Sequence, residues 1–449
     1  MSMFKKALKD REAIKKVPEI LVKKGPAPLS LVRGMRDILP EDQPLWERLR
    51  NQARDLAHAY CFDRIDTPLL EETALFIRGV GKQTDIVEKE LYSFETSGGE
   101  AVSLRPESTA AVVRAYIQHG MFNQPQPVKL WNIGSMFRHD RPQHGRYRQF
   151  QQFSCEVLGE SDSVIDAQLI LIGYLFAKEL GIETSVHINS IGTPESRGNY
   201  KNVLVAYFRS KRNKLSDEDK RRLVKNPLRL LDSKDPALQE LKAEAPQIVD
   251  WLDEESKAHF MHVLEYLDEL NVPYQLNPYL VRGLDYYTKT VFEYYATTGE
   301  QDLAQSALGG GGRYDGLAEL LGGRPTPAAG FSMGLDRIFM LLKAAAGEVP
   351  PREHEVFVAQ LGEQGRKKAL VIFEELRQAK IFAGEAFSKN ALKVQMELAN
   401  RQKAKFAIII GQKEVIDGTA IIRDMDAGTQ EIVDARKVVQ AVRKQLGQA

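Results

Sequence analysis

Residues 195–272 differ in texture from the sequence on either side of them, and this difference limits the folds that the chain can adopt. They are charged, follow a mostly helical pattern and contain few β-branched residues. Before them, Lys129–Phe137 and Arg148–Leu158 predict an antiparallel hairpin with a basic tip. After them, Leu276–Tyr295 returns to strand-like sequence. Because the β-rich flanks resemble each other more than the segment between them, we interpret that segment as a helical insertion into one domain.

A second structural unit is predicted at the C-terminal end. Gly347–Arg352 contains two prolines and is typical of a linker. Beyond it, strands and helices are predicted in alternation, at Val356–Leu361, Arg366–Gln378, Ala404–Ile410, Thr419–Arg423 and Ala435–Leu446. This alternation predicts a small α/β domain over residues 354–449, separate from a larger domain over 31–346.

Residues 1–30 form a third, basic segment, with seven Lys and one Arg against three acidic residues. The segment lacks the apolar core of a secretory signal, so a solvated N-terminal extension or a basic arm is favoured over a targeting role. The whole chain of 449 residues has a formal net charge of only +1. Any contact with nucleic acid is therefore expected to come from local basic patches.

The composition is that of a soluble globular protein, with 43% hydrophobic and 27% charged residues. No apolar run reaches the roughly 18 to 20 residues that span a bilayer, so no membrane partner is expected. The two cysteines, Cys61 and Cys155, form neither a disulfide framework nor a CxxC pair, which favours a reducing, cytoplasmic setting. The histidines have no thiols or carboxylates around them at zinc spacing, and no protein ligand for a metal is predicted.

The spacing of apolar residues and the positions of glycines predict several further helices and strands. One face of a helix collects Leu45, Trp46, Leu49, Ala53, Leu56 and Tyr60. A strand is predicted at Phe62–Leu70, and helices at Glu107–His119, Asp166–Leu180 and Gly334–Ala346. The glycine run Gly309–Gly312 is interpreted as a break in the chain.

The segment Met136–Phe150 is the richest in residues suited to chemistry, with four arginines and one acid on the predicted hairpin. Arginine presents a planar fork that binds phosphate through paired hydrogen bonds and keeps its charge. Phe150 could stack on a nucleotide base. No Walker sequence or GxGxxG motif competes for a nucleotide. On composition alone, a solvated basic turn is an equal alternative.

The segment Leu280–Thr288 places an arginine, an aspartate and two tyrosines close together. In a strand, alternation would put Arg282, Leu284 and Tyr286 on one face, with Asp285 and Tyr287 on the other. Tyrosine is also common in strands that have no functional role, so the alternative is an ordinary strand.

The segment Gly330–Arg337 has glycines before a helix whose first turn carries Asp336 and Arg337. A glycine-rich entry allows a ligand to approach the backbone closely. An ordinary helix start is the alternative interpretation.

Taken together in this order and spacing, these segments resemble the class II aminoacyl-tRNA synthetases and, within them, the histidyl-tRNA synthetase family. The resemblance runs from about Arg33 to the C-terminus. The supporting segments are Arg33–Pro40, similar to the family's opening; the stretch from there to Pro68, similar to motif 1; Met136–Glu156, similar to motif 2; Gly330–Arg337, similar to motif 3; and Leu104–Ala110, Leu280–Tyr287 and Gly312–Gly316. The Leu280–Tyr287 segment matches a pattern largely private to the histidine enzyme, which argues against a synthetase for another amino acid.

The resemblance implies an α+β fold: an antiparallel-sheet catalytic domain with a helical insertion, a C-terminal α/β anticodon-binding domain, and a homodimer. It implies catalytic roles for Arg282, between the substrate carboxylate and the α-phosphate, and for Arg138, on the α-phosphate. The implied ATP-binding residues are Arg138, Asp140, Arg146, Phe150 and Arg337, with Phe150 on the adenine and Arg146 and Arg337 on the outer phosphates. The implied histidine-binding residues are Glu107, Thr109 and Gln152 for the amino group, Glu156 and Tyr287 for the imidazole, and Arg282, Tyr286 and Tyr314. Mg²⁺ is expected on the pyrophosphate oxygens.

The implied reaction activates L-histidine with ATP and then transfers it to the 3′-terminal adenosine of tRNA(His). The alternative is a catalytically silent paralogue, either a histidine-binding regulatory subunit or an RNA-binding relative; such relatives tend to lose the C-terminal domain or the arginine at position 282. Three positions depart from the family pattern. Cys61 and Ser108 stand where glycine is common, and Asp140 stands where glutamate is usual. None of these changes removes a charge that the chemistry needs.

Overall fold

The computed structural model describes residues 29–82, 84–142, 145–231, 233, 235–297, 307–346 and 354–447. The predicted linker at 347–352 and almost all of the predicted extension over 1–30 lie outside the described residues. The described residues fall into two compact units, one made of those within 1–37, 57–175 and 183–337 and the other of those within 38–56, 176–182 and 338–449. The domain limits at 31–346 and 354–449 stay a prediction.

An eight-stranded sheet forms the centre of the first unit. In spatial order its strands are β1 (Asp63–Arg64), β5 (Val128–Phe137), β6 (Gln149–Leu158), β11 (Ala328–Gly334), β10 (Gly309–Arg313), β9 (Thr288–Ala296), β7 (Thr184–Ser190) and β8 (Tyr274–Leu276). The strands from β5 to β7 pair antiparallel, and only the two edge pairs, β1 with β5 and β7 with β8, are parallel. The α+β class and the antiparallel sheet are therefore confirmed.

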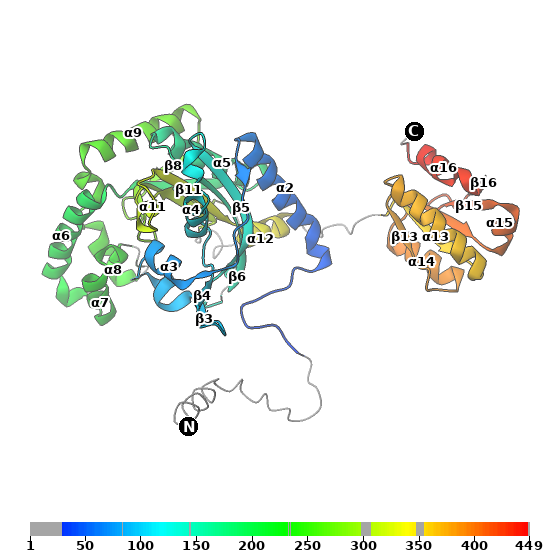
Figure 1. Ribbon diagram of the computed structural model, residues 1–449, viewed down its shortest axis with the longest axis horizontal. Helices are drawn as coiled ribbons and strands as arrows, with labels where there is room; N and C mark the ends of the chain where they lie inside the picture. The colour runs from blue at the N-terminus through cyan, green and yellow to red at the C-terminus, as the bar shows by residue number, and fades with distance from the viewer. Residues whose placement is uncertain are drawn as a thin grey trace, which may run out of the picture. The chain divides into compact units, whose positions relative to one another are not determined.

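Helices make up much of the rest of residues 29–346 that the structure describes. They are α2 (Gln43–Ala59), α3 (Thr73–Gly79), α4 (Thr109–Gln118), α5 (Ser163–Glu179), α6 (Pro194–Ser210), α7 (Asp217–Lys225), α8 (Pro236–Ala243), α9 (Glu254–Glu269), α11 (Leu317–Leu320) and α12 (Leu335–Ala346). A small sheet of β2 (Leu70–Glu72), β4 (Ala101–Leu104) and β3 (Tyr92–Glu95) lies between α2 and α4 in the chain. Figure 1 shows α6, α7, α8 and α9 gathered together in green. The insertion is helical, as predicted. No helix in the described part of the chain has the length and apolarity to cross a membrane.

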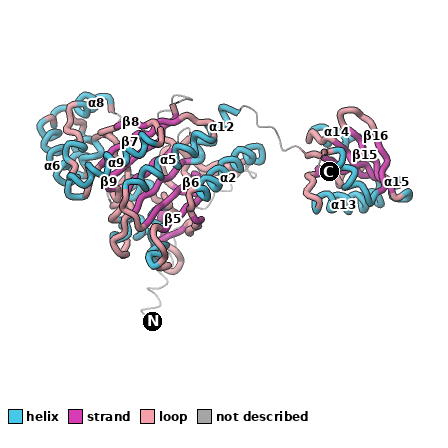
Figure 2. Tube along the Cα trace, turned by 90° about the horizontal axis from the view of Figure 1, so that it is seen from above, coloured by secondary structure: helices cyan, strands magenta, loops and turns pink. Residues whose placement is uncertain are grey.

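The two faces of the large sheet have different roles, and β6 shows how. Its residues Phe153, Cys155 and Val157 are buried, in a layer where Phe153 and Tyr294 both contact the ring of Phe331. The Tyr294 hydroxyl donates to a carbonyl oxygen of α5 at 3.0 Å, so α5 covers this face; Figure 2 shows α5 over the strands. The alternate residues of β6 face α4 and a pocket. Strand alternation thus separates core positions from site positions.

Several local predictions are confirmed. The hairpin pairs β5 with β6 in register from Val128 opposite Leu158 to Phe137 opposite Gln149. On α2, the predicted apolar face is buried from Leu45 to Leu56, and Trp46 stacks on Phe339 of α12 with ring centroids 5.1 Å apart. Tyr60 is the exception in that set: it follows the end of the helix and is only half-buried.

The strand predicted at Phe62–Leu70 is wrong over most of its length. Only Asp63–Arg64 pairs with β5, and the chain next pairs at Leu70–Glu72 in the small sheet. Pro68 has no N–H to donate to a strand ladder. The Thr67 carbonyl instead accepts a hydrogen bond from the Arg105 side chain at 2.9 Å. The segment therefore leaves one sheet and enters another.

The break predicted at Gly309–Gly312 is also wrong, because this glycine run is strand β10, paired on both sides. Glycine is weak in an isolated strand, but here the neighbouring backbones approach closely. A Cβ at Gly310 would lie 2.5 Å from the Phe292 carbonyl oxygen. The glycines are therefore required by the packing of the sheet, which the sequence alone did not show.

The segment Leu280–Tyr287 is not a strand either, so the predicted division of its residues between two faces is wrong. The ladder of β9 begins only at Thr288. Before that, the loop is held by scattered contacts: the Leu280 carbonyl accepts from Asn189 at 3.1 Å, and the Asp285 N–H donates to the Val80 carbonyl at 3.1 Å. As a loop, the segment can turn both tyrosines, Tyr286 and Tyr287, toward the pocket.

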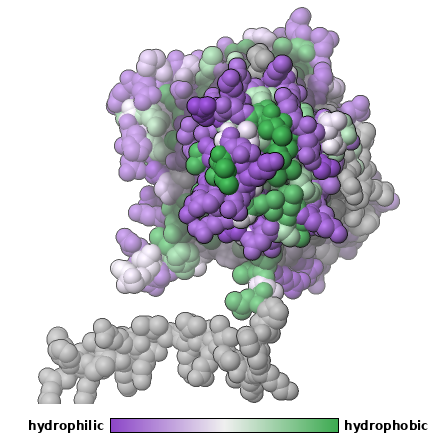
Figure 3. Space-filling model, turned by 90° about the vertical axis from the view of Figure 1, so that its right-hand side faces the viewer, coloured by the Kyte–Doolittle hydropathy of each residue, from purple (hydrophilic) through white to green (hydrophobic). Residues whose placement is uncertain are grey.

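The C-terminal α/β domain has its own five-stranded sheet, in the order β13-β12-β14-β15-β16. Its elements are β12 (Val356–Gln360), α13 (Gly362–Gln378), β13 (Ala383–Glu385), α14 (Leu392–Arg401), β14 (Phe406–Ile410), α15 (Gln412–Asp417), β15 (Thr419–Asp424), β16 (Gln430–Asp434) and α16 (Val438–Gln445). The five elements predicted here are confirmed, and β13, α14, α15 and β16 were not predicted. Figure 3 shows a largely hydrophilic surface with apolar areas in green; in this domain Ile416 and Ile432 are among the exposed apolar residues.

Candidate active site

A cavity of about 220 Å³ opens on the face of the large sheet opposite α5. All but two of the predicted site residues line it: Glu107, Thr109, Arg138, Asp140, Arg146, Phe150, Gln152, Arg282, Tyr286, Tyr287 and Arg337. The other two, Glu156 and Tyr314, are hydrogen-bonded to each other and lie beneath it. Five separate stretches of chain thus converge on one site. Their convergence is a fact of the structure, while the role of each residue stays a prediction.

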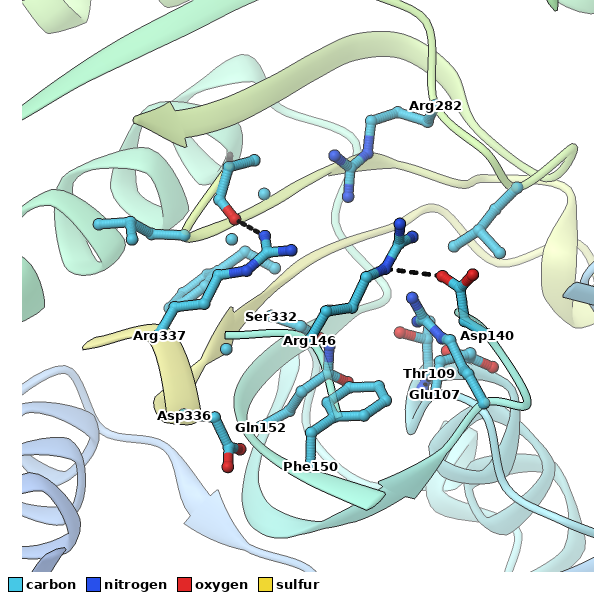
Figure 4. A pocket seen from close by; sticks show the side chains of 18 of the residues that line it. Glu107, Thr109, Asp140, Arg146, Phe150, Gln152, Arg282, Ser332, Asp336 and Arg337 are labelled. Atoms are coloured by element: carbon cyan, nitrogen blue, oxygen red, sulfur yellow. Dashed lines mark hydrogen bonds and ion pairs between the residues drawn. The ribbon is translucent and has the colours of Figure 1, made fainter. Parts of the chain in front are cut away.

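Four arginines form one end of the cavity, which we call the arginine end: Arg138, Arg146, Arg282 and Arg337. Figure 4 shows Arg146, Arg282 and Arg337 directed into the same space. Burial lowers the pKa of Arg337, and the charges of Arg146 and Arg138 lower it further. Mutually repelling cations in one cavity favour a polyanionic ligand such as a triphosphate.

Two of these arginines are anchored by oxygens that leave part of each guanidinium available. Arg138 donates from Nε to the Pro106 carbonyl oxygen at 2.9 Å, and Arg146 Nε lies 2.7 Å from a carboxylate oxygen of Asp140. The Asp140–Arg146 pair shows that the shorter acid at the departing position still reaches an arginine of the site. The hairpin tip between them includes residues 143 and 144, which lie outside the described residues.

Arg337 stands in the first turn of α12, and the neighbouring Asp336 fixes where that turn lies. The Asp336 carboxylate accepts from the Gln151 N–H at 2.6 Å and pairs with Arg36 at 2.7 Å. Arg36 also lies over the Tyr147 ring, 4.5 Å from its centroid. One carboxylate therefore ties α12 to β6 and to the N-terminal segment. Asp336 was noticed in the sequence as a helix-start residue, but it was not predicted as part of the site.

Phe150 lies on β6 at the cavity and is half-buried, with the Arg138 guanidinium carbon 5.2 Å from its ring centroid. Gln152 follows on the same face, two residues further along. Its Oε1 is buried and has no hydrogen-bond partner within the described part of the chain. A buried acceptor of this kind costs free energy until a donor reaches it, which favours a ligand carrying an N–H group.

Glu156, Thr109 and Tyr314 form a hydrogen-bonded cluster that we call the Glu156 end: Thr109 lines the cavity, and Glu156 and Tyr314 lie behind it. The Thr109 hydroxyl donates to Glu156 Oε1 at 2.7 Å, and the Tyr314 hydroxyl donates to Oε2. Glu156 is 1% exposed, and burial raises its pKa to about 8. Gly330 stands opposite it on β11, where a Cβ would lie 1.8 Å from Oε2. Only glycine leaves room for this carboxyl group.

Glu107 lies just before α4 and binds the first turn of that helix. Its carboxylate oxygens accept from the Thr109 N–H at 2.6 Å and the Ala110 N–H at 3.0 Å. Burial raises the pKa of Glu107, while these two N–H groups act in the opposite direction. The helix N-terminus thus holds an acidic side chain at the wall of the cavity.

Aromatic rings close the side of the cavity between its two ends. The rings of Tyr286 and Tyr287 have centroids 4.7 Å apart, and Tyr286 also contacts Tyr314 at 5.6 Å. Arg282 lies above Tyr287, with 5.6 Å between its guanidinium carbon and the ring centroid. The rings of Tyr286 and Tyr287 therefore give this side of the cavity an aromatic wall.

Two further features were missed by the sequence analysis. Three serine hydroxyls form a chain that reaches the cavity: Ser108 donates to Ser154 at 3.0 Å, and Ser154 is 2.7 Å from Ser332. Glu293 of β9 pairs with Arg282. Strand alternation gave a signal for Ser154, which lies between Gln152 and Glu156 on one face of β6. A lone acidic residue among the apolar and aromatic residues of 291–296 was the available signal for Glu293.

Two protein-family models match the chain. One is described as histidyl-tRNA synthetase and matches residues 34–195 and 201–338. The other is described as an anticodon binding domain and matches residues 355–445. The two matches together leave out the N-terminal extension and the predicted linker.

Individual relatives agree with these families. The histidine–tRNA ligase of Desulforudis audaxviator is 45% identical over 418 residues, covering 93% of this chain and 99% of the relative. That of Dehalococcoides mccartyi is 43% identical over 416 residues, covering 92% and 99%. Among solved structures, apo histidyl-tRNA synthetase of S. aureus has a TM-score of 0.77 at 35% identity, covering 93% of this chain and 100% of that one.

Proposed function

This chain belongs to the histidyl-tRNA synthetase family and is a histidine–tRNA ligase, and we propose that its cavity is where L-histidine reacts with ATP. The products of that step are histidyl-adenylate and pyrophosphate. In a second step the histidyl group passes to the 3′-terminal adenosine of tRNA(His). We assign the activation chemistry to residues 31–346 and anticodon binding to 354–449. One observation carries the assignment: a single cavity lined by four arginines also reaches Thr109, whose hydroxyl donates to the buried Glu156.

Activation brings two anions together, because the histidine carboxylate must attack the α-phosphorus of ATP. A fixed cation between the two groups lowers their repulsion and stabilises the charge that gathers in the transition state. Arg282 suits this position because it lies beside the aromatic wall between the two ends of the cavity. We assign Arg138 to the α-phosphate, Arg146 and Arg337 to the outer phosphates, and Phe150 to the adenine face.

Histidine is selected at the Glu156 end. The Glu156 carboxyl group, with Tyr287 beside it, would pair with the imidazole nitrogens, and Tyr286 and Tyr314 would enclose the ring. An amino acid without those nitrogens would leave a buried polar group unpaired. Sites built in this way discriminate by ~10⁴ to 10⁵.

The substrate amino group is assigned to Glu107, Thr109 and Gln152. Glu107 offers a buried carboxylate, and Gln152 offers an acceptor oxygen that no described donor reaches. An ammonium group would satisfy both. Thr109 connects this subsite to the imidazole subsite because its hydroxyl donates to Glu156.

Magnesium fits the site as a companion of the nucleotide. Within the described ranges, no group of three or more His, Cys, Asp or Glu side chains is placed to hold a metal ion. The nearby acids Asp140 and Asp336 are paired with Arg146 and Arg36. The pyrophosphate oxygens and water would therefore supply most Mg²⁺ ligands, as is usual for this ion. When bound, Mg²⁺ would neutralise part of the phosphate charge.

We further propose a homodimer and a cytoplasmic location. The dimer rests on the likeness of residues 33–68 to motif 1, the interface segment of class II synthetases. The location rests on two free cysteines, Cys61 and Cys155, which suit a reducing compartment. Sedimentation equilibrium would measure the molecular mass, and a monomer at micromolar concentration would contradict the dimer.

ATP–pyrophosphate exchange with the purified protein tests the proposed reaction, with each of the twenty amino acids supplied in turn. We expect exchange with histidine and with no other amino acid. Exchange with a different amino acid would overturn the assigned pocket. No exchange with any of them, from a folded protein, would instead favour the catalytically silent paralogue.

A further inference from the structure

Glu293, on β9, is the acidic residue that contacts Arg282, and nothing above assigns it a part in the reaction. Arg282 donates from Nη1 to Glu293 Oε1, and both side chains are largely buried, at 18% and 16% exposure. The second oxygen, Oε2, accepts from the Tyr295 hydroxyl at 2.5 Å. Both oxygens of Glu293 are therefore engaged, one on the arginine and the other on a neighbouring residue of the same strand.

The Tyr295 contact makes the carboxylate a fixed group. The Tyr295 ring lies against His187 of β7, with centroids 4.5 Å apart, and His187 is the register partner of Glu293. A long side chain on a rigid strand, hydrogen-bonded on its far side, has little freedom to follow a moving arginine. The arginine is positioned by the carboxylate, and not the reverse.

The neighbouring strand makes room for this pair. Gly310 of β10 is the register partner of Glu293, and a Cβ there would lie 2.8 Å from Arg282 Nη1 and 3.0 Å from Glu293 Cγ. Any larger residue at position 310 would push the ion pair apart. Gly310 thus leaves room for the ion pair as well as for the backbone of β9.

The ion pair uses only one edge of the guanidinium. Arg282 Nε is buried and has no hydrogen-bond partner among the residues that the structure describes. Burial opposes the charge on Arg282, but Glu293 and Tyr287 raise the pKa of the guanidinium above its usual value. The Arg282 guanidinium is thus kept charged and is held by Glu293 through Nη1. Its Nε–H is left as a donor without a described partner.

We propose that Glu293 is a positioning residue for histidine activation: it holds one edge of the Arg282 guanidinium so that the remaining N–H groups face the reacting phosphate. This inference rests on the role proposed for Arg282. Glu293 itself touches neither substrate, so its loss should slow the chemical step and leave binding of both substrates nearly unchanged. Loss of such a group lowers kcat because a donor pointing in the wrong direction stabilises the transition state less.

The experiment compares Glu293→Gln with the wild type in ATP–pyrophosphate exchange. Glutamine keeps the shape and one acceptor but removes the charge. Loss of a charged hydrogen bond corresponds to a roughly 10- to 100-fold fall in kcat, with KM for histidine and ATP changing less than about twofold. Tyr295→Phe, which keeps the carboxylate but frees its far side, should give a smaller fall. Glu255→Gln is the matched control: Glu255 pairs with Lys289 of β9 at 2.7 Å and is 76% exposed, and no change is expected.

A double-mutant cycle separates positioning from a general structural role. In an Arg282→Ala background, Glu293→Gln should cause almost no further loss, because nothing remains to be positioned. Full additivity of the two losses would overturn the inference while leaving the proposed role of Arg282 intact. A higher Mg²⁺ requirement in Glu293→Gln would also overturn it, by making Glu293 a metal ligand. If Arg282→Ala itself activates histidine at a normal rate, the role of Arg282 and the inference fail together.

Discussion

The two ends of the cavity are built in opposite ways. The arginine end takes its side chains from loops and a helix start, and Arg146 at that end is 47% exposed. The Glu156 end takes its groups from β6, from α4 and from the residue after β10, and Glu156 is 1% exposed. Charge acts over distance and tolerates movement, whereas recognition of a small ring needs hydrogen bonds at fixed positions. Under the assignment that we propose, phosphate is held by charge and histidine by geometry.

The largest effect expected at the arginine end is that of Arg282→Ala. Histidine activation should slow by at least ~10²-fold, as when a preorganised donor is removed from a transition state. The measurement is single-turnover formation of the adenylate. Arg324→Ala is a matched control, because Arg324 also lies over an aromatic ring, that of Phe122, but outside the cavity. A near-normal rate for Arg282→Ala would remove the assigned role.

At the opposite end, Glu156→Ala should weaken histidine selection more than ATP binding. Breaking a buried hydrogen-bonded group costs about 2 to 3 kcal/mol, or roughly 30- to 150-fold in kcat/KM for histidine. KM for ATP should stay within about twofold, because the phosphate contacts lie at the other end. Glu71→Ala is a control, since Glu71 is 10% exposed and pairs with Arg114 outside the cavity. An unchanged preference for histidine over other amino acids would contradict the assignment.

The same carboxyl group predicts a pH dependence of stability that the arginine end lacks. Burial raises the pKa of Glu156 from 4.5 to about 8. The folded protein therefore keeps a proton that the unfolded chain releases, so this contribution is complete below pH ~4.5 and is lost as pH rises through about 8. Between pH 6.5 and 7.5 the free energy of unfolding of the wild type should fall by about 1 kcal/mol more than that of Glu156→Gln. Denaturant titrations at the two pH values measure this, and parallel curves would show that Glu156 is ionised in the folded protein.

The smallest effect is expected outside both ends, at Cys61. This residue follows α2 with φ of +61°, where its N–H donates to the His58 carbonyl and the Phe62 N–H donates to the Ala57 carbonyl. That pattern is typical of a helix end and favours glycine. Cys61→Gly should raise the free energy of unfolding by about 0.5 kcal/mol, because relief of the backbone strain exceeds the added chain entropy. Thermal unfolding measures the change, and exchange activity should stay constant; a destabilised variant would contradict this account.

Local pattern was enough to predict much of this molecule. The strand predicted at Arg148–Leu158 is β6, and the two-residue alternation of a strand puts Phe150, Gln152 and Glu156 on one of its faces. The same holds for the buried face of α2 and for the alternating elements of the C-terminal domain. Each of these predictions depends on a period of two or 3.6 residues within one element, which needs no knowledge of distant segments.

Contacts between distant segments were decided only by the tertiary structure. The sequence predicted a break at the glycines of β10, but the structure pairs them with β9 and β11. The sequence predicted a strand at Leu280–Tyr287, but the structure has a loop there. The role inferred for Glu293 depends on its ion pair with Arg282, a residue outside β9. Sequence pattern reports which residues share a face, because that depends on backbone geometry alone. Which faces meet depends on packing free energy summed over the whole chain, and only the folded structure contains that information.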